Sequence, residues 1–564
     1  MKRHAFFALF LLILAGWATA QQPIYATQKE AIGDSVMVVS AHPLATQVGV
    51  KVLRSGGNAV DAAVAVQFAL AVVYPQAGNI GGGGFMVYRS AKGETATLDY
   101  REKAPAAAHR DMYLDSTKRA VSAWSRFGSL ACGVPGSVDG MWEAHTKYGR
   151  LKWAQLVQPA VDLAEKGFAI TPQEAANLNR ERGNFMRYNT LVPPFFKMGD
   201  WQAGDTLKQR DLGQTLRRII DSGRDGFYRG ATALLILNEM GKQRGLITAA
   251  DLEAYHSVWR KPLEFDWKGL HVITMPPPSS GGIILRQVLG MVADYPLATY
   301  GHHSAAAVHL MAEAERRAFA DRAEHMGDPD FWKVPLRSLT DTAYFKQRMA
   351  NFKADAATPS KTLKAGGPFK ESDQTTHLSI VDAQGNAVSV TTTLNDSYGS
   401  RVVVGGAGFI LNNEMDDFSA QPGVPNLYGA VGGEANAIAP HKRPLSSMTP
   451  TILTKADKTW MVVGTPGGTT IPSSVFQVIV DVVEFGLPLP EAVQAKRFHH
   501  QHLPDQISFE EGGLPESVQE ELRRKGHTLT PRGPMGRVEA IMRLPNGRWQ
   551  GVADKRGDDS AAGY

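Results

Sequence analysis

The chain has 564 residues, of which 43% are hydrophobic and 20% are charged. This composition excludes wholesale disorder and predicts one large folded unit or two to three domains. The formal net charge of +5 is small for this length. Because the sequence has no basic run and no aromatic-basic ladder, we expect no nucleic-acid partner.

The first twenty residues have the pattern of a secretory signal. They begin with Lys2 and Arg3, continue with a short uncharged apolar run and end in Ala-Thr-Ala. We therefore expect cleavage before Gln21, a periplasmic or secreted product and no membrane span after signal removal. Cys132 is the only cysteine, which excludes an internal disulfide. It lies in an apolar stretch and is predicted to be buried and unreactive.

The mature chain starts with a predicted strand at 36–40. Two predicted helices follow within 42–72, separated by the Ser55-Gly56-Gly57 sequence. The second helix is almost entirely apolar but contains Asp61 and Gln67, which indicates a buried helix and not a membrane span.

The next stretch combines glycines, a strand and a long helix-rich region. Glycines 81–84 lead into a strand from Phe85, and since no Gly-Lys-Ser/Thr sequence follows, they predict close backbone packing and no phosphate cradle. Residues 152–327 are predicted to be helix-rich. Within them the charged stretch that begins at 312 predicts a helix with a solvated face.

A polar linker, rich in Lys, Gly, Pro and Ser, runs from 357 to 374 and is predicted to be exposed and accessible to proteases. Beyond it the pattern changes to alternating strands, with a hairpin turn at Gly385-Asn386. The predicted strands lie at 377–382, 386–394, 401–411, 451–455 and 459–468, and a helix is predicted at 472–486. Paired strands between long helices predict an α+β fold, a four-layer helix/sheet/sheet/helix sandwich.

Thr375 stands at the start of this strand-rich part, in the sequence QTTHLS. The ordinary interpretation is that Thr375, Thr376 and His377 lead the chain into a sheet. The alternative is a cut between Gln374 and Thr375, which would place a free α-amine and a hydroxyl, base and nucleophile, on one residue. An α-amine has a pKa of about 7.7–8.0 and can act as a base near neutral pH, which the amide nitrogen cannot.

Many separate stretches resemble the γ-glutamyltranspeptidase, or glutathione hydrolase, family. In the family's order they are GGNAVDAAVA, GNIGGGGF, LDYREKAP, PPPSSGG, TTHLSIVD, LNNEMDDFS, PGVPNLYGAVGG, RPLSSMTPTI, GTPGG, RFHHQ and the final AGY. The resemblance implies an N-terminal-nucleophile hydrolase, made as an inactive precursor that cuts itself before Thr375. Its two associated subunits would be residues 21–374, which are helix-rich, and residues 375–564, which carry the nucleophile.

The resemblance also implies catalytic roles. Thr375 would be the nucleophile, and the Thr393 hydroxyl would bond to it, although position 393 taken alone favours a simple strand residue. The backbone amides of Gly467 and Gly468 would hold the developing oxyanion, and the same pair is also typical of a tight turn.

A γ-glutamyl substrate carries an ammonium and a carboxylate on one carbon. The family pattern assigns two groups of residues to them: Asn395, Glu414 and Asp417 to the ammonium, and Arg101, Ser446 and Ser447 to the carboxylate. Guanidinium and hydroxyl donors suit a carboxylate. Taken alone, Arg101 is more often structural and Asp417 more often a turn or cap residue. Tyr428, in the loop 422–433, would close over the pocket, in a stretch equally typical of an inert surface loop.

The implied reaction transfers the γ-glutamyl group of glutathione or a related compound, through a Thr375 acyl-enzyme, to water, an amino acid or a dipeptide. No cofactor or metal is implied, and His499, His500 and His502 lack a pattern such as HExxH. A serine hydrolase is not supported, because the sequence contains no GxSxG motif. Two alternatives remain: a glutaryl or cephalosporin acylase, whose substrate lacks the α-ammonium that Asp417 and Asn395 would bind, and a non-catalytic exported binding protein.

Overall fold

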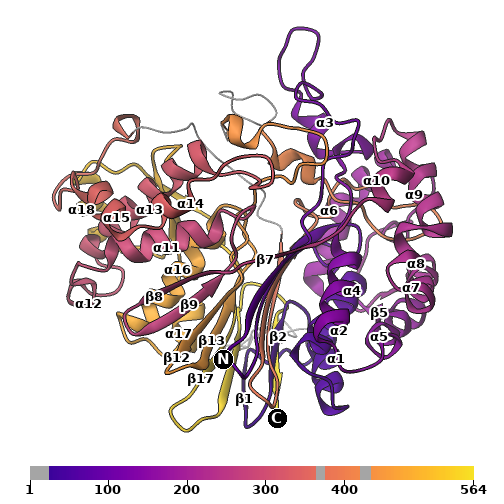
Figure 1. The fold of residues 1–564 in the computed structure, drawn as a ribbon, viewed down its shortest axis with the longest axis horizontal. Coiled ribbons are helices and arrows are strands. Elements are labelled where there is room, and N and C mark those ends of the chain that lie inside the picture. The colour runs from indigo at the N-terminus through magenta and orange to yellow at the C-terminus, as the bar shows by residue number, and fades with distance from the viewer. Residues whose placement is uncertain (1–23, 364–374, 420–432) are drawn as a thin grey trace, which may run out of the picture.

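The computed structural model describes residues 24–363, 375–419 and 433–564. The predicted signal, Gln374 before the predicted cut, and Tyr428 therefore lie outside the described residues. Within them, two seven-stranded sheets lie face to face, and helices cover the outer side of each sheet (Figure 1). The predicted four-layer α+β sandwich is confirmed.

The first sheet has the strand order β19-β2-β10-β11-β3-β4-β7, and all its neighbouring strands are antiparallel. Its strands are β2 (Met37–Ser40), β3 (Gly83–Arg89), β4 (Thr95–Asp99), β7 (Val258–Arg260), β10 (Thr376–Val381), β11 (Ala387–Thr393) and β19 (Ser560–Gly563). Strands from both sides of position 375 are therefore paired within one sheet.

The second sheet has the order β1-β18-β17-β13-β12-β9-β8. Its strands are β1 (Glu30–Gly33), β8 (Leu263–Trp267), β9 (Leu270–Thr274), β12 (Thr451–Lys455), β13 (Lys458–Gly464), β17 (Glu539–Arg543) and β18 (Trp549–Ala553). Apolar side chains of both sheets, among them Val39, Val87, Ile452 and Val462, form the core between them. Two small sheets hold β5 (Phe168–Ala169) with β6 (Thr206–Leu207), and β14 (Phe498–His499) with β15 (Ile507–Glu510) and β16 (Leu529–Arg532).

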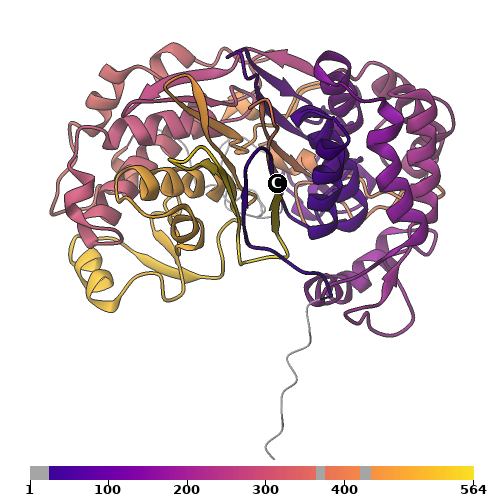
Figure 2. The ribbon, with the colours of Figure 1, turned by 90° about the horizontal axis from the view of Figure 1, so that it is seen from below.

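One set of helices lies on the side of the first sheet (Figures 1 and 2). They are α1 (Pro43–Arg54), α2 (Ala59–Val73), α3 (Ser122–Arg126), α4 (Ser137–Tyr148), α5 (Trp153–Lys166), α6 (Pro172–Tyr188), α7 (Arg210–Ser222), α8 (Asp225–Tyr228), α9 (Gly230–Lys242) and α10 (Ala249–Glu253). Helix α2 is fully buried, as predicted. Its Asp61 caps the helix start by accepting from the Asn58 amide, and it also accepts from the Arg150 amide, so the buried carboxylate is satisfied.

A second set lies on the side of the second sheet. It comprises α11 (Gly281–Val292), α12 (Leu297–Tyr300), α13 (Ala305–His325), α14 (Leu336–Leu339), α15 (Thr342–Met349), α16 (Thr470–Val483), α17 (Leu489–Gln494) and α18 (Glu516–Arg524). Across the described ranges, every helix falls short of either the length or the hydropathy that a bilayer crossing requires.

Three sequence predictions need correction. The stretch 401–411 is a loop with one isolated bridge, because Gly406 and Gly408 adopt positive φ angles that turn the chain back. The described part of the predicted linker is exposed only in part: Pro359, Lys361 and Thr362 are exposed, but Thr358, Ser360 and Leu363 are buried. The region 152–327 is helix-rich as predicted, with short strands such as β7 to β9 between its helices.

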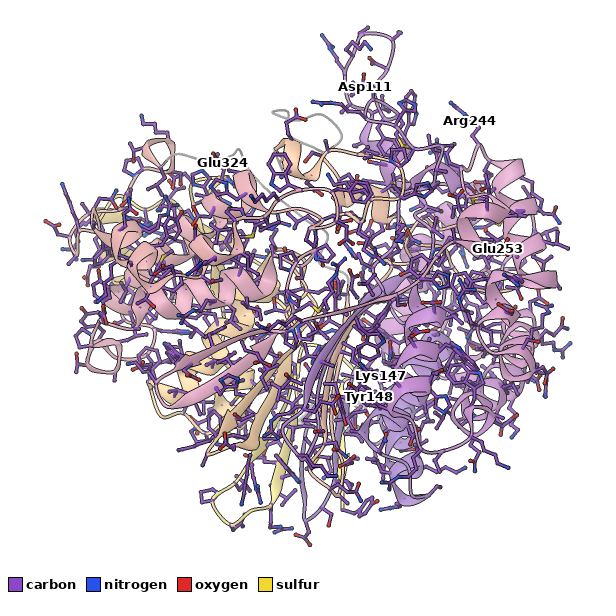
Figure 3. All side chains as sticks on the ribbon, viewed as in Figure 1. Asp111, Lys147, Tyr148, Arg244, Glu253 and Glu324 are labelled. Carbon is purple, nitrogen blue, oxygen red and sulfur yellow. The ribbon has the colours of Figure 1, made fainter. Side chains whose placement is uncertain are left out.

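The third correction concerns α13, which was predicted to have a solvated charged face. Glu324 is exposed (Figure 3), but Glu313, Arg316 and Arg317 are buried. Arg317 bonds to Glu313 at 2.6 Å and Arg316 to the same carboxylate at 3.1 Å, so the charges compensate one another inside the protein. A local charge pattern cannot distinguish such internal pairs from a solvated face.

Candidate active site

Thr375 lies directly before β10, at one end of the first sheet. Thr376 pairs with Thr392, so the antiparallel register continues to place Thr375 opposite Thr393. Thr393 pairs with Gly83, and the β3–β4 register, extended two residues past the end of β4, places Arg101 opposite Gly83. With about 4.8 Å between neighbouring strands, roughly 14 Å separate the Cα atoms of Thr375 and Arg101. The sheet thus aligns the predicted nucleophile with the predicted carboxylate-binding residue.

The residues after β11 form a rigid corner beside Thr375. The Asn395 amide donates to the Thr393 hydroxyl at 2.8 Å, and the Asn395 side-chain Nδ2 donates to the Asn413 carbonyl at 3.0 Å. Asn395 has a φ of 75°, in the left-handed region that Asn tolerates better than most residues. These bonds fix the Thr393 hydroxyl next to the position of Thr375.

Gly467 and Gly468 connect β13 to α16. Their φ angles of 137° and 55° favour glycine, and a Cβ on Gly467 would lie 2.6 Å from the Thr470 hydroxyl. The carbonyls of the pair accept from the Thr470 and Ile471 amides at 3.0 and 3.1 Å, which starts α16. The turn therefore stands at a helix N-terminus, where backbone amides and the helix dipole favour negative charge.

Arg101 is buried against carboxylates from a short 3-10 helix (Glu414–Asp417). Its guanidinium forms ion pairs with Glu414 and Asp417 and lies 3.8 Å from Glu102. It also donates to the Pro444 and Leu445 carbonyls at 3.3 Å. The predicted ammonium side and carboxylate side are therefore one charge network and not two separate walls.

Burial dominates the titration of this network. It raises the pKa of Glu414 to about 8 and that of Glu102 to about 7, while Arg101 acts in the opposite direction. Glu102 was not predicted to be a site residue. Two features could have indicated Glu102. It follows Arg101 directly in the sequence, and position 83 is a glycine, where a Cβ would overlap with the Glu102 carboxylate.

Ser446 and Ser447 lie in the segment before β12 and are both buried. The Ser446 carbonyl accepts from the Ser280 amide and hydroxyl at 2.7 Å, which ties this segment to the PPPSSGG stretch. Among the described residues, no partner bonds to the Ser447 hydroxyl. Because Arg101 bonds to the two preceding carbonyls, both serines belong to the surroundings of its guanidinium.

His377 lies between the two sheets. Its Nδ1 is 2.8 Å from the Thr391 hydroxyl, its Nε2 is 3.1 Å from the Ser379 hydroxyl, and desolvation lowers its pKa to about 3. A buried neutral ring bonded to strand hydroxyls positions β10 and β11 and is a poor proton acceptor. Burial likewise raises the pKa of Cys132 to about 12, in agreement with its prediction as an unreactive core residue.

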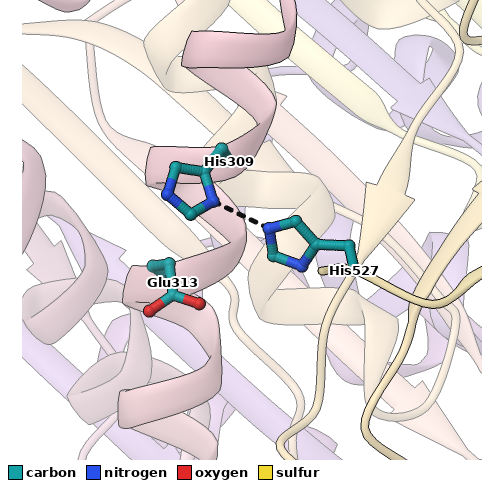
Figure 4. A group of neighbouring side chains, drawn as sticks. All are labelled: His309, Glu313 and His527. Carbon is teal, nitrogen blue, oxygen red and sulfur yellow. Dashed lines mark hydrogen bonds between the residues drawn. The ribbon is translucent and has the colours of Figure 1, made fainter. Parts of the chain in front are cut away.

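The described residues include one group with metal-ligand geometry, which is His309, Glu313 and His527 (Figure 4). His309 Nδ1 lies 2.7 Å from His527 Nε2, and the Glu313 carboxylate is paired with Arg316 and Arg317. Two guanidinium groups already compensate this carboxylate and would repel a cation. The chemistry of the group therefore favours a buried hydrogen-bond network. Histidines 499, 500 and 502, which lack a metal-binding pattern, are buried as well.

The model of the γ-glutamyltranspeptidase family matches residues 45–564. A glutathione hydrolase proenzyme of Escherichia coli (strain K12) is 48% identical over 533 residues, which cover 94% of this chain and 92% of the relative.

Two solved structures are similar to the chain. A cephalosporin acylase from Bacillus halodurans has a TM-score of 0.83 at 25% identity and covers 97% of this chain and 99% of its own. A γ-glutamyltranspeptidase from Helicobacter pylori has 46% identity and a TM-score of 0.56, over 57% of this chain and 93% of its own. The Helicobacter pylori structure has the lower TM-score because it covers a smaller part of this chain, but its sequence identity is much higher than that of the acylase.

Proposed function

Because the chain belongs to the γ-glutamyltranspeptidase family, we propose that it is a γ-glutamyl acyltransferase and hydrolase with Thr375 as its nucleophile. The observation that carries this proposal is the alignment of Thr375, Thr393 and Arg101 at one end of the first sheet. Glutathione and related γ-glutamyl compounds are the proposed substrates, and water, amino acids or dipeptides the proposed acceptors. No step requires a cofactor.

The first step is activation. The chain is cut between Gln374 and Thr375, so that the neutral amide nitrogen of Thr375 becomes an amine that can accept the hydroxyl proton. Residues 21–374 and 375–564 remain associated, because β10, β11 and β19 are paired with strands that precede position 375. The pattern of the first twenty residues supports export of the precursor to the periplasm or the medium.

The second step is acyl transfer. Thr375 Oγ1 attacks the γ-carbonyl carbon while the α-amine takes its proton, and the same proton leaves with the departing amine. The Gly467 and Gly468 amides, at the start of α16, are suited to hold the oxyanion. The Thr393 hydroxyl, fixed by the Asn395 amide, orients Thr375 by a hydrogen bond. Water or a second amine then attacks the acyl-enzyme and restores Thr375.

Substrate binding exchanges charges within the Arg101 network. The α-carboxylate of the substrate bonds to the guanidinium, supported by the Ser446 and Ser447 hydroxyls, and the α-ammonium takes the place of Arg101 at Glu414 and Asp417. The Asn395 side-chain oxygen adds an acceptor for the ammonium. Because a zwitterion replaces an internal ion pair, no buried charge is left without a counterion.

The acid-rich network also distinguishes the proposed substrate from a glutaryl compound. A glutaryl group has no α-ammonium, so it would leave Glu414 and Asp417 without a cation to bind. The identities of 48% and 46% to glutathione hydrolase and transpeptidase relatives support the same choice, because they exceed the 36% to an acylase proenzyme of Pseudomonas sp. (strain SE83) and the 25% to the solved cephalosporin acylase.

The test compares γ-glutamyl-p-nitroanilide with glutaryl-p-nitroanilide as substrates of the purified wild-type protein. We expect p-nitroaniline release from the first and little from the second. Thr375→Ala should abolish release, and Thr375→Ser, which keeps the hydroxyl, should retain a measurable part. Faster release from the glutaryl compound would establish the acylase alternative, and no release from either would support a binding protein.

A further inference from the structure

Thr375 borders a second polar region, on the opposite flank from Arg101. A cavity of about 340 Å³ is lined by Thr375, by Pro466 next to the oxyanion turn, and by polar side chains that include Arg180 and Asp558. Asp558 lies two residues before β19. Because β19 and β10 are both antiparallel to β2, they start at the same end of the first sheet. In the strand order, β19 lies on one side of β10 and β4, which leads to Arg101, lies on the other.

This arrangement matches the two halves of an amide substrate. A nucleophile that attacks a γ-glutamyl amide has the acyl group on one side and the amine on the other. The Arg101 network holds the acyl side, so the cavity on the β19 flank is where the amine side must extend. A cavity of this size can hold a small ligand such as a dipeptide.

The arginines that line the cavity differ in how many ion pairs and hydrogen bonds they already form. Arg556 bonds to Glu510 at 2.6 and 2.8 Å and to Asp554 at 2.9 and 3.0 Å. Arg537 bonds to the Tyr74 hydroxyl and lies 3.8 Å from Asp559. Among the described residues, Arg180 has no carboxylate within ion-pair distance, and its one bond goes to the Asn177 side chain at 2.7 Å.

Arg180 is exposed at the cavity, and Asn177 orients its guanidinium by a hydrogen bond. Asn177 is buried, and its side-chain oxygen accepts from both Arg180 and Gln173, while its amide donates to Gln76. The neighbouring Glu174 carboxylate is directed to other partners, because it accepts from the Thr171 amide at 2.8 Å and lies 3.7 Å from His42 Nε2. An oriented cation in a polar cavity is suited to a carboxylate.

We propose that this cavity is the amine-side subsite, and that Arg180 selects amines that carry a carboxylate. These are the cysteinylglycine part of glutathione as leaving group, and amino acids or dipeptides as acceptors. Asp558, which accepts from the Thr171 hydroxyl, offers a counterion to an amine that arrives protonated. In transfer, the neutral amine nitrogen bonds to the γ-carbonyl carbon, the ester bond to Thr375 Oγ1 breaks, and the amine proton returns to Thr375. The inference rests on the proposed function.

The experiment measures transfer from γ-glutamyl-p-nitroanilide to glycylglycine and to glycylglycinamide, which lacks the carboxylate. The readout is the ratio of the two kcat/KM values, which is insensitive to the amount of folded enzyme. Arg180→Gln should lower this ratio roughly 10-fold or more, as expected for the loss of a charged hydrogen bond. Arg180→Lys should retain part of the preference because it keeps the charge.

Arg182→Gln is the matched control. It lies on the same helix, does not line the cavity and pairs with Asp200 at 3.1 Å, so the ratio should stay at the wild-type value. An unchanged ratio in Arg180→Gln would overturn the inference, as would an equal fall in both kcat/KM values. A wild-type protein that releases no p-nitroaniline even without an acceptor would instead contradict the proposed function.

Discussion

At the scale of single residues, Arg101 is the charged residue of the candidate site that has the most ion-pair partners. Its guanidinium is buried, pairs with Glu414 and Asp417 and lies near Glu102. Removing one partner from such a network leaves the other charges uncompensated, and this costs about 3–5 kcal/mol of stability. The same guanidinium is proposed to bind the substrate carboxylate, so its loss should affect both stability and substrate binding.

We expect Arg101→Gln to lower kcat/KM for γ-glutamyl-p-nitroanilide roughly 100-fold or more, because truncating a buried charge pair costs about 2–5 kcal/mol. Arg101→Lys should lose less, since it keeps the charge but not the forked geometry. The control is Arg217→Gln, whose pair with Glu165 is about half exposed and should contribute little. Equal kinetics for Arg101→Gln and Arg217→Gln would contradict the proposed binding mode.

The buried His377 ring predicts how the stability of the protein depends on pH. Its pKa is lowered to about 3 in the fold, whereas an unfolded histidine titrates near 6.5. Between these values the unfolded state binds the extra proton, so the contribution of His377 to stability is present above pH 6.5 and is lost as the pH falls. In His377→Asn, the slope of unfolding free energy against pH should be smaller by about 1.4 kcal/mol per unit below pH 6.

Denaturant unfolding between pH 4.5 and 7.5, in the Thr375→Ala background so that one uncut chain unfolds, provides this measurement. The two stability curves should approach each other as the pH falls. Parallel curves would show that His377 is not held neutral in the fold.

At the scale of elements, β13 carries the oxyanion turn and depends on close packing against β10. A Cβ at Gly464 would overlap with the His377 ring. We expect Gly464→Ala to destabilise the protein by about 1–3 kcal/mol. Because Gly467 follows three residues later, activity should fall as well. Gly183→Ala, in α6 with open space around it, should instead stabilise by about 0.5–1 kcal/mol. The melting temperatures of both variants test these two expectations. Similar changes in melting temperature for Gly464→Ala and Gly183→Ala would refute the packing argument.

Elements with a strong local pattern could be predicted from the sequence. The alternation of β10 and β11 and the turn at Gly385-Asn386 fix their register, which places Thr375 opposite Thr393. The loop 401–411 was mistaken for a strand because its runs of apolar residues are typical of strands, whereas Gly406 and Gly408 turn the chain between them. The buried charges of α13 were mistaken for a solvated face because Glu313 meets its partners only in the fold.

At the scale of the whole molecule, the site joins segments that are far apart in the sequence. Family resemblance supplied Arg101, Glu414 and Asp417, but only the fold shows that they pair with one another and that Glu102 joins them. Likewise, Arg180 and Asp558 line one cavity with Thr375 although helix α6 and the chain before β19 are distant in sequence. Spacing along a chain carries no signal for such contacts.

The interleaved first sheet also predicts how the molecule behaves after the proposed cut. In this sheet, β2 lies between β19 and β10, and β11 pairs with β3. Two cleaved chains should therefore elute together as one native species in size-exclusion chromatography and separate only in denaturant. Separation under native conditions would contradict this view of the assembly.

The most direct test of the central claim is the N-terminal sequence and mass of each chain in the active wild-type protein. We expect two chains, the smaller of which begins Thr375-Thr376-His377, together with γ-glutamyl-p-nitroanilide hydrolysis. Thr375→Ala should remain a single inactive chain. A wild-type protein that is uncut and nevertheless hydrolyses the substrate would contradict the account, because Thr375 would then have no α-amine to act as its base.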